Sequence, residues 1–144
     1  MIEMESVYKT YPDGTDALRN ISLRVKEQEF VYIVGPSGAG KSTFMKMIYL
    51  EERPSSGRIL FNSFDLEYIK RRRIPYLRRQ IGVIFQDFKL LPKLTVFENV
   101  AYAMEVIETP KKLIHPRVYE VLEMVQLADK ANSLPNQLSG GQQQ

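Results

Sequence analysis

The sequence of 144 residues lacks cysteine and tryptophan and contains one histidine, His115. Without cysteine, the protein can have no disulfide framework, thiol nucleophile or cysteine-based zinc site. This absence suits a reducing compartment such as the cytoplasm. The histidine stands directly before Pro116, a position typical of a loop or the start of a helix, and we expect no catalytic role for it.

Long apolar runs and a strong charge bias are also lacking. No apolar run approaches the roughly 20 residues that span a membrane, and the first residues show no signal-peptide pattern. We therefore expect any membrane role to be peripheral and to require a partner. The apolar fraction of 44% and the charged fraction of 26% are ordinary for a globular protein. The net charge of +3 is too small to demand a nucleic-acid partner by itself.

The most informative stretch matches the P-loop pattern G-x-x-x-x-G-K-[ST]. An apolar, β-branched run, Phe30–Val34, precedes it and is typical of a buried strand, and the residues after it are typical of a helix. Strand, glycine-rich loop and helix are the context that the pattern requires. The matching residues are Gly35, Pro36, Ser37, Gly38, Ala39, Gly40, Lys41, Ser42 and Thr43.

The residue types in this stretch suit a polyphosphate. Glycines let the backbone curl so that its N–H groups converge on an anion, and the N-terminus of the following helix adds its dipole. Lys41 can reach the β and γ phosphates, and Ser42 can place its hydroxyl on Mg²⁺ with Thr43 as a weaker neighbour. The alternative, a glycine-rich turn with an unrelated lysine, rarely produces four constrained positions by chance.

The rest of the chain up to Gln86 mixes strands with one helix, which indicates an α/β or α+β class. We expect strands at residues 1–7, 21–25 and 58–61, and a second buried strand at Ile81–Phe85.

Beyond Gln86 the pattern becomes helical. Thr95 is a predicted N-cap with Glu98 completing a capping box, and Pro116 suits the first turn of a further helix. Val96, Val100 and Met104 share one helical face. Val118, Leu122 and Val125 form a stripe at helical spacing that is most simply core.

Basic residues are concentrated at Lys70–Arg73, with Arg78 and Arg79 close by. Such a cluster can bind nucleic acid. It can also be a solvated surface, or a patch that faces acidic lipid or protein. We favour the solvated surface, because no interleaved aromatic residues suggest base stacking.

A second motif, Leu138-Ser139-Gly140-Gly141-Gln142, lies about a hundred residues after the P-loop. Together with the P-loop, Gln86 and an aromatic residue at Tyr11, it makes the whole sequence resemble the nucleotide-binding domain of ABC ATPases. Within that family, residues 77–91 and 95–100 are most similar to the ATPases of bacterial cell division.

The resemblance implies a role for each motif. Tyr11 would stack on adenine, and Gln86 would help ligate Mg²⁺, orient water and act with Lys41 in catalysis. Ser139, Gly140, Gly141 and Gln142 would contact the ATP bound by a second copy, so that a head-to-tail homodimer closes two sites. An integral membrane partner resembling FtsX would contact residues around 86–104, which places the protein in the cytoplasm at the inner face of the membrane.

The resemblance also implies an α/β P-loop core. Residues 1–86 would form its N-terminal part with an antiparallel β-subdomain, and residues 87–144 the Q-loop and an α-helical subdomain. The family's later strand, which carries an aspartate for Mg²⁺ and a glutamate general base, has no counterpart in the sequence, and neither has its switch histidine. We therefore expect an N-terminal fragment that binds nucleotide but hydrolyses it slowly, since a positioned base is worth roughly 10² to 10⁴ in rate. We expect its uncovered apolar faces to be buried by self-association or strand exchange.

Three other functions remain open on the sequence. The first is an ABC exporter or lipoprotein-release ATPase. The second is a non-catalytic nucleotide-binding or assembly fragment. The third is a nucleic-acid-associated ATPase that uses Arg71–Arg73, although we expect no nucleic-acid partner.

Overall fold

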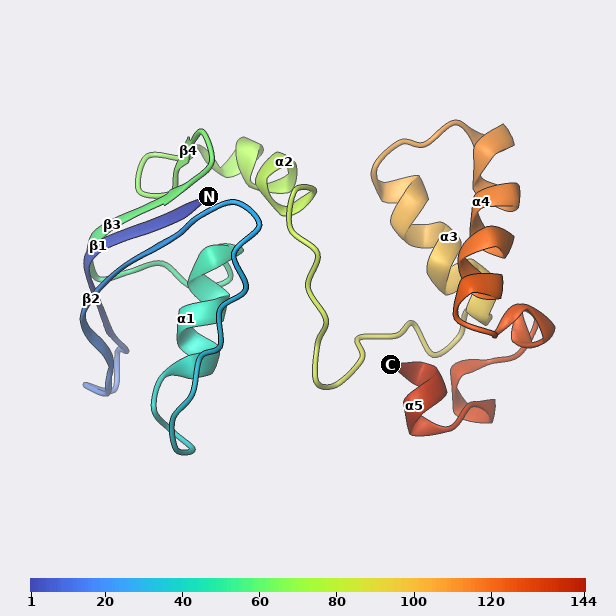
Figure 1. Cartoon of the computed structure of the whole chain (residues 1–144), viewed down its shortest axis with the longest axis horizontal. Coiled ribbons are helices and arrows are strands. Elements are labelled where there is room, and N and C mark those ends of the chain that lie inside the picture. Colours follow the sequence, from blue (N-terminus) through green and yellow to red (C-terminus); the bar gives the residue numbers. More distant parts are fainter. The chain divides into compact units, whose positions relative to one another are not determined.

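The computed structural model describes all residues from 1 to 144, and they divide into two compact units, Met1–Gly82 and Val83–Gln144. The first unit contains a sheet and two α-helices, and the second contains helices (Figure 1). No helix combines the length and the apolar character needed to cross a bilayer.

The sheet of the first unit has four antiparallel strands in the order β2-β1-β3-β4. Met4 in the middle of β1 pairs with Leu23 on one side and Ile59 on the other, and both Met4 and Ile59 are buried. The antiparallel pairing of these strands confirms the predicted antiparallel sheet. The strands are β1 (Ile2–Thr10), β2 (Asp16–Val25), β3 (Ser56–Phe61) and β4 (Phe64–Asp65).

Helix α1 (Lys41–Ile48) packs into the same core as this sheet. Its buried residues, Thr43, Phe44, Met47 and Ile48, recur at the spacing of one helical face. A 3₁₀ turn (Arg71–Arg73) leads into the short helix α2 (Ile74–Arg78). The position of α1 directly after the glycine-rich loop is as predicted.

The second unit is built around α3 (Val96–Val106) and α4 (Lys111–Met124). Its remaining elements are two 3₁₀ turns, Ala128–Lys130 and Pro135–Gln137, and the four-residue helix α5 (Gly140–Gln143). The predicted capping box is confirmed at the start of α3. The buried core consists of Val96, Ala101, Ile114, Val118, Leu122 and Ala131.

Two predicted strands are wrong. Phe30–Val34 and Ile81–Phe85 have no strand structure, and Phe30, Val34 and Ile84 are 78%, 87% and 84% exposed. A strand requires backbone groups on a neighbour to bond with, and only β1 to β4 pair in this chain. Apolar composition alone therefore does not make these segments strands.

The prediction for Pro116 is also wrong, because α4 begins five residues earlier and contains Pro116 in its interior. His115 consequently lies on the helix instead of in a loop or at the helix start, and its ring lies 5.3 Å from Phe97 and 4.9 Å from Tyr119. Val118 and Leu122 are buried as expected, but Val125 follows the last residue of α4 and is 58% exposed.

Candidate functional site

The glycine-rich loop curls tightly before α1. Gly38 and Gly40 have left-handed backbone angles, with φ of 80° and 82°, and Gly35 has φ of 155°. Gly40 also lies against β2, since a Cβ atom built on it would be 2.2 Å from the carbonyl oxygen of Ala17. Glycine is therefore required at Gly40 both by conformation and by space.

The start of α1 offers unpaired donors. The first bond of the helix runs from the Phe44 N–H to the Gly40 carbonyl at 2.8 Å, and no side chain caps the N-terminus. The N–H groups of Gly40, Lys41, Ser42 and Thr43 thus have no partner within the helix. Exposed N–H groups at a helix N-terminus form a binding site for an anion.

Lys41 points back over the loop. Its ammonium group donates to the carbonyl oxygens of Gly35 at 2.8 Å and Pro36 at 2.7 Å. This contact leaves a cation beside the unpaired amides, with only neutral carbonyls as partners. Ser42 is exposed and its hydroxyl makes no hydrogen bond within the protein, so it is free to bind a metal ion.

Tyr11 reaches the same helix from the end of β1. Its hydroxyl lies 3.1 Å from the Thr43 hydroxyl, and the Lys9 ammonium lies 5.0 Å from the centre of its ring. Thr43 is buried, so its hydroxyl is held by this contact instead of being open to a ligand. The structure therefore brings Tyr11 next to Thr43, the last residue of the P-loop pattern.

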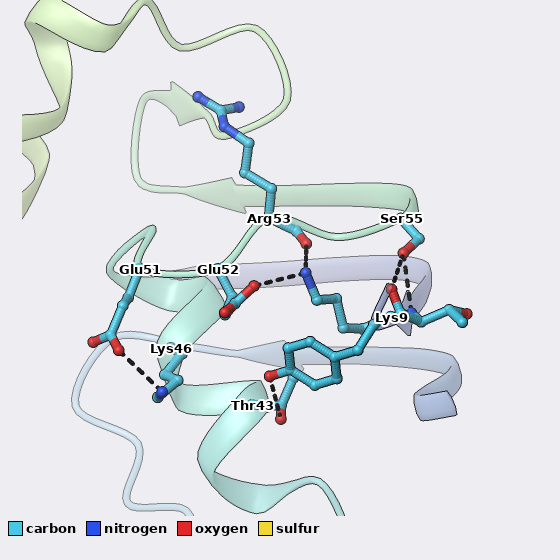
Figure 2. A network of polar contacts seen from close by, with 9 residues as sticks. Lys9, Thr43, Lys46, Glu51, Glu52, Arg53 and Ser55 are labelled. Carbon is cyan, nitrogen blue, oxygen red and sulfur yellow. Dashed lines mark hydrogen bonds and ion pairs between the residues drawn. The ribbon is translucent and has the colours of Figure 1, made fainter. Parts of the chain in front are cut away.

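A polar network fixes this corner (Figure 2). Lys9 pairs with the Glu52 carboxylate at 2.7 Å and donates to the Arg53 carbonyl at 2.9 Å, while Lys46 on α1 pairs with Glu51 at 3.0 Å. Sequence reasoning missed this network, because Lys9 and Glu52 are more than 40 residues apart and belong to no motif.

Gln86 lies in the second unit, in an exposed turn. The next residue, Asp87, pairs with Lys89 at 2.5 Å, and the hydrogen bond from Lys89 holds the pKa of the Asp87 carboxyl below its usual value. Phe88 and Lys89 both have positive φ, 56° and 53°. Two consecutive non-glycine residues in this region mark a strained loop, a feature that clusters at functional sites.

Asn99 holds the chain that follows this turn. Its side-chain amide donates to the carbonyls of Leu91, Leu94 and Thr95 at 2.9 to 3.1 Å, and its oxygen accepts from the Leu91 N–H at 2.8 Å. Sequence reasoning missed this residue. An Asn in the first turn of a helix often bonds backbone groups, but its partners are not apparent from spacing.

The second motif forms the start of α5, which also lies in the second unit. Ser139 is the N-cap: its hydroxyl accepts from the Gln142 N–H at 3.4 Å, and its own N–H donates to the Gln142 side chain at 3.0 Å. Gly140 and Gly141 follow it and are exposed. Ser139 and Gln142 thus bond to each other, and the glycines keep the helix start uncovered.

A base or a second metal ligand is not assembled around these residues. No group of three or more His, Asp or Glu side chains is arranged to hold a metal ion. None of Lys41, Ser42 and Gln86 contacts an acidic side chain in the structure. The first unit presents donors suited to a polyphosphate, and the exposed Ser42 hydroxyl could hold a metal ion beside it. Gln86, the other predicted metal ligand, belongs to the second unit.

Comparison with known proteins shows which family and which relatives this chain resembles. Residues 18–144 match the ABC transporter family. The chain is 63% identical over 144 residues to the cell division ATP-binding protein FtsE of Bacillus subtilis, and 44% identical to the methionine import ATP-binding protein MetN of Helicobacter acinonychis. Each match covers 100% of this chain, but only 63% of the FtsE protein and 44% of the MetN protein.

A solved structure agrees with the fold. An ATP-binding cassette in a dimeric, post-hydrolysis state bound to ADP and Pi superposes with a TM-score of 0.89 at 38% sequence identity. The match covers 99% of this chain and 65% of that one. The antiparallel sheet and the helical unit are therefore parts of a known cassette fold. The chain spans a little under two thirds of the FtsE protein and of the solved cassette, and less than half of the MetN protein.

Proposed function

The chain belongs to the ABC transporter family, and on that premise we propose that it binds ATP and Mg²⁺ as part of a complex acting in bacterial cell division. The observation that carries ATP binding is the curled loop before α1, with its unpaired amides and the Lys41 ammonium. The cell-division role rests on 63% identity to an FtsE protein, against 44% for a methionine importer.

Each predicted site residue in the first unit has its own role in this proposal. The amides of residues 38–43 and the Lys41 ammonium bind the β and γ phosphates, and this requires Lys41 to exchange its two loop carbonyls for phosphate oxygens. The exposed Ser42 hydroxyl binds Mg²⁺. Tyr11 supports adenine, held in place by its contact with Thr43.

Gln86 and the second motif complete the site in this proposal. Gln86 ligates Mg²⁺ and orients water. Ser139, Gly140, Gly141 and Gln142 meet the ATP of a second copy in a head-to-tail homodimer, and ATP thereby links the copies. Support for such pairing comes from the dimeric state of the solved cassette. Light scattering should show a mass increase with Mg·ATP but not with Mg·AMP.

Hydrolysis by this chain is proposed to be slow. Within the first unit the Lys41 ammonium contacts only carbonyl oxygens and no acidic side chain, and a positioned base is worth roughly 10² to 10⁴ in rate. We further propose a cytoplasmic location and a membrane partner resembling FtsX, which contacts residues around 86–104. Co-purification with such a membrane protein tests this partner independently of nucleotide.

The direct test of ATP binding is an equilibrium titration with Mg·ATP. Lys41→Ala should abolish detectable binding, because it removes the only cation that contacts the loop. Lys46→Ala is the matched control: it removes a lysine five residues further along α1 that pairs with Glu51 instead, and it should leave the affinity within about twofold. Equal affinities of Lys41→Ala and the parent protein would refute the P-loop assignment.

A further inference from the structure

The net positive charge of the protein comes from one short segment. Residues 68–79 hold six of the twenty Lys and Arg side chains and none of the seventeen Asp and Glu. Fourteen basic side chains therefore face seventeen acidic ones in the rest of the chain, which is net negative. The overall charge of +3 conceals this separation.

The six basic side chains have different surroundings in the structure. Arg78 points into the first unit, where it donates to the carbonyls of Tyr49 and Leu50 after the end of α1. The guanidinium of Arg79 lies 5.4 Å from the centre of the Tyr76 ring. The other four, Lys70–Arg73, form an exposed turn before α2 (Figure 1), here named the basic turn, and none of them is in an ion pair.

Two exposed tyrosines flank the basic turn. Tyr68 is 74% exposed and Tyr76 is 58% exposed. A shallow hollow of about 520 Å³ lies between Phe64, Arg72, Arg73 and Tyr76. Unpaired cations beside amphipathic rings are the combination found where proteins meet the headgroup region of a membrane.

From this arrangement we propose that the basic turn, with Tyr68 and Tyr76, is a docking surface for anionic phospholipid headgroups. Charge complementarity carries the argument, because four unpaired cations attract an anionic surface while the net negative remainder of the chain is repelled from it. The basic turn is therefore the segment that an anionic surface attracts most strongly. The inference rests on the proposed function, which brings the protein to a membrane. The contact with lipid is argued only from the residues of the basic turn and the two tyrosines.

Lipid is favoured over nucleic acid by the placement of these groups. Binding to a nucleic acid strand needs cations that follow a backbone and open aromatic faces for bases. Here the cations occupy consecutive positions in a single turn, and the ring of Tyr76 already carries the Arg79 guanidinium. A compact cluster suits a laterally mobile surface of headgroups better than a linear strand.

The test is co-sedimentation of the full chain with vesicles of 30% phosphatidylglycerol in phosphatidylcholine, against pure phosphatidylcholine, at low and high salt. Each cation near an anionic surface contributes about fivefold, so Arg71→Gln with Arg72→Gln should weaken partitioning about 25-fold. Lys111→Gln with Lys112→Gln is the control, because it removes two exposed cations from the start of α4 in the second unit. It should change partitioning by less than about twofold.

Equal binding to both kinds of vesicle would overturn the proposal, and so would equal losses of vesicle binding in the two double variants. A third contrary result is tighter binding to duplex DNA than to the anionic vesicles, if the DNA binding is also weakened by Arg71→Gln with Arg72→Gln. The last result would assign the surface to nucleic acid. Mg·ATP titration of the same variants separates this inference from the proposed function. A chain that binds vesicles but not ATP refutes only the function, and one that binds ATP but not vesicles refutes only the lipid surface.

Discussion

Replacing Gly40 by alanine tests how the loop is held against the sheet. The residue has φ of 82°, and its added Cβ atom would lie 2.2 Å from the Ala17 carbonyl oxygen and 2.8 Å from a Leu18 methyl carbon. Left-handed backbone costs an alanine about 1 to 2 kcal/mol. Relieving the overlap means moving β2 or the start of α1, and such overpacking costs about 1 to 3 kcal/mol more.

The total of about 2 to 5 kcal/mol is a large part of the stability of a small domain, which is about 5 to 15 kcal/mol. Urea unfolding followed by circular dichroism measures it. With a slope of about 1 to 3 kcal/mol per molar urea, the midpoint should fall by about 0.7 M or more. Mg·ATP affinity should also fall, because the amides of the loop move together with α1.

Two further glycines make the comparison specific. Gly38→Ala has nearly the same φ, 80°, but its Cβ meets nothing within 4 Å, so only the conformational cost of about 1 to 2 kcal/mol applies. Gly57→Ala would place its Cβ 2.3 Å from the Ser6 carbonyl, away from the loop, and should destabilise the protein without changing ATP affinity in the folded state. If Gly40→Ala and Gly38→Ala lose the same stability, the contact between the loop and β2 is not what requires glycine at Gly40.

Three more substitutions probe contacts outside the loop. The hydrogen bond from the Thr95 N–H lowers the pKa of the Glu98 carboxyl in the folded protein. The stabilisation from this bond is therefore present above the pKa of Glu98 in the unfolded chain, and it is lost as the pH falls through the pKa in the folded protein. Glu98→Gln should therefore make the free energy of unfolding less dependent on pH in a urea series from pH 6 to 3, and an unchanged dependence would contradict this. Arg78→Met removes two donations to carbonyls after α1 and should cost about 1 to 2 kcal/mol in urea unfolding, whereas Arg73→Met should cost almost nothing; equal losses would show that Arg78 is only a surface charge. Asn99→Ala should raise the hydrogen-exchange rate of the Leu91 amide at least tenfold, measured by NMR, and an unchanged rate would mean that another group protects it.

Features set by residues close in sequence were predictable. The start of α1 follows from the glycine-rich pattern, and the capping box at Thr95 and Glu98 joins groups three residues apart. The sheet was predicted because β1, β2 and β3 find their partners within the chain. In each case the stabilising contact is local, or is a pairing that the alternation of side chains makes visible.

Features set by distant partners were not predictable. Phe30–Val34 has the composition of a strand but meets no pairing neighbour in this chain. Arg78 belongs by sequence to a basic cluster, yet its guanidinium binds carbonyls 28 and 29 residues away. Pro116 was expected to start a helix, but the burial of Ile114, two residues before it, favours extending α4 through it.

The most direct test of the central claim is an NMR titration of ¹⁵N-labelled protein with Mg·ATP, with Mg·AMP as the control that lacks the β and γ phosphates. The account predicts that the amide signals of Gly38 to Thr43 shift most, saturate together with ATP, and barely move with AMP. If these amides stay in place while others shift, the loop before α1 does not bind the phosphates and the proposed function is wrong.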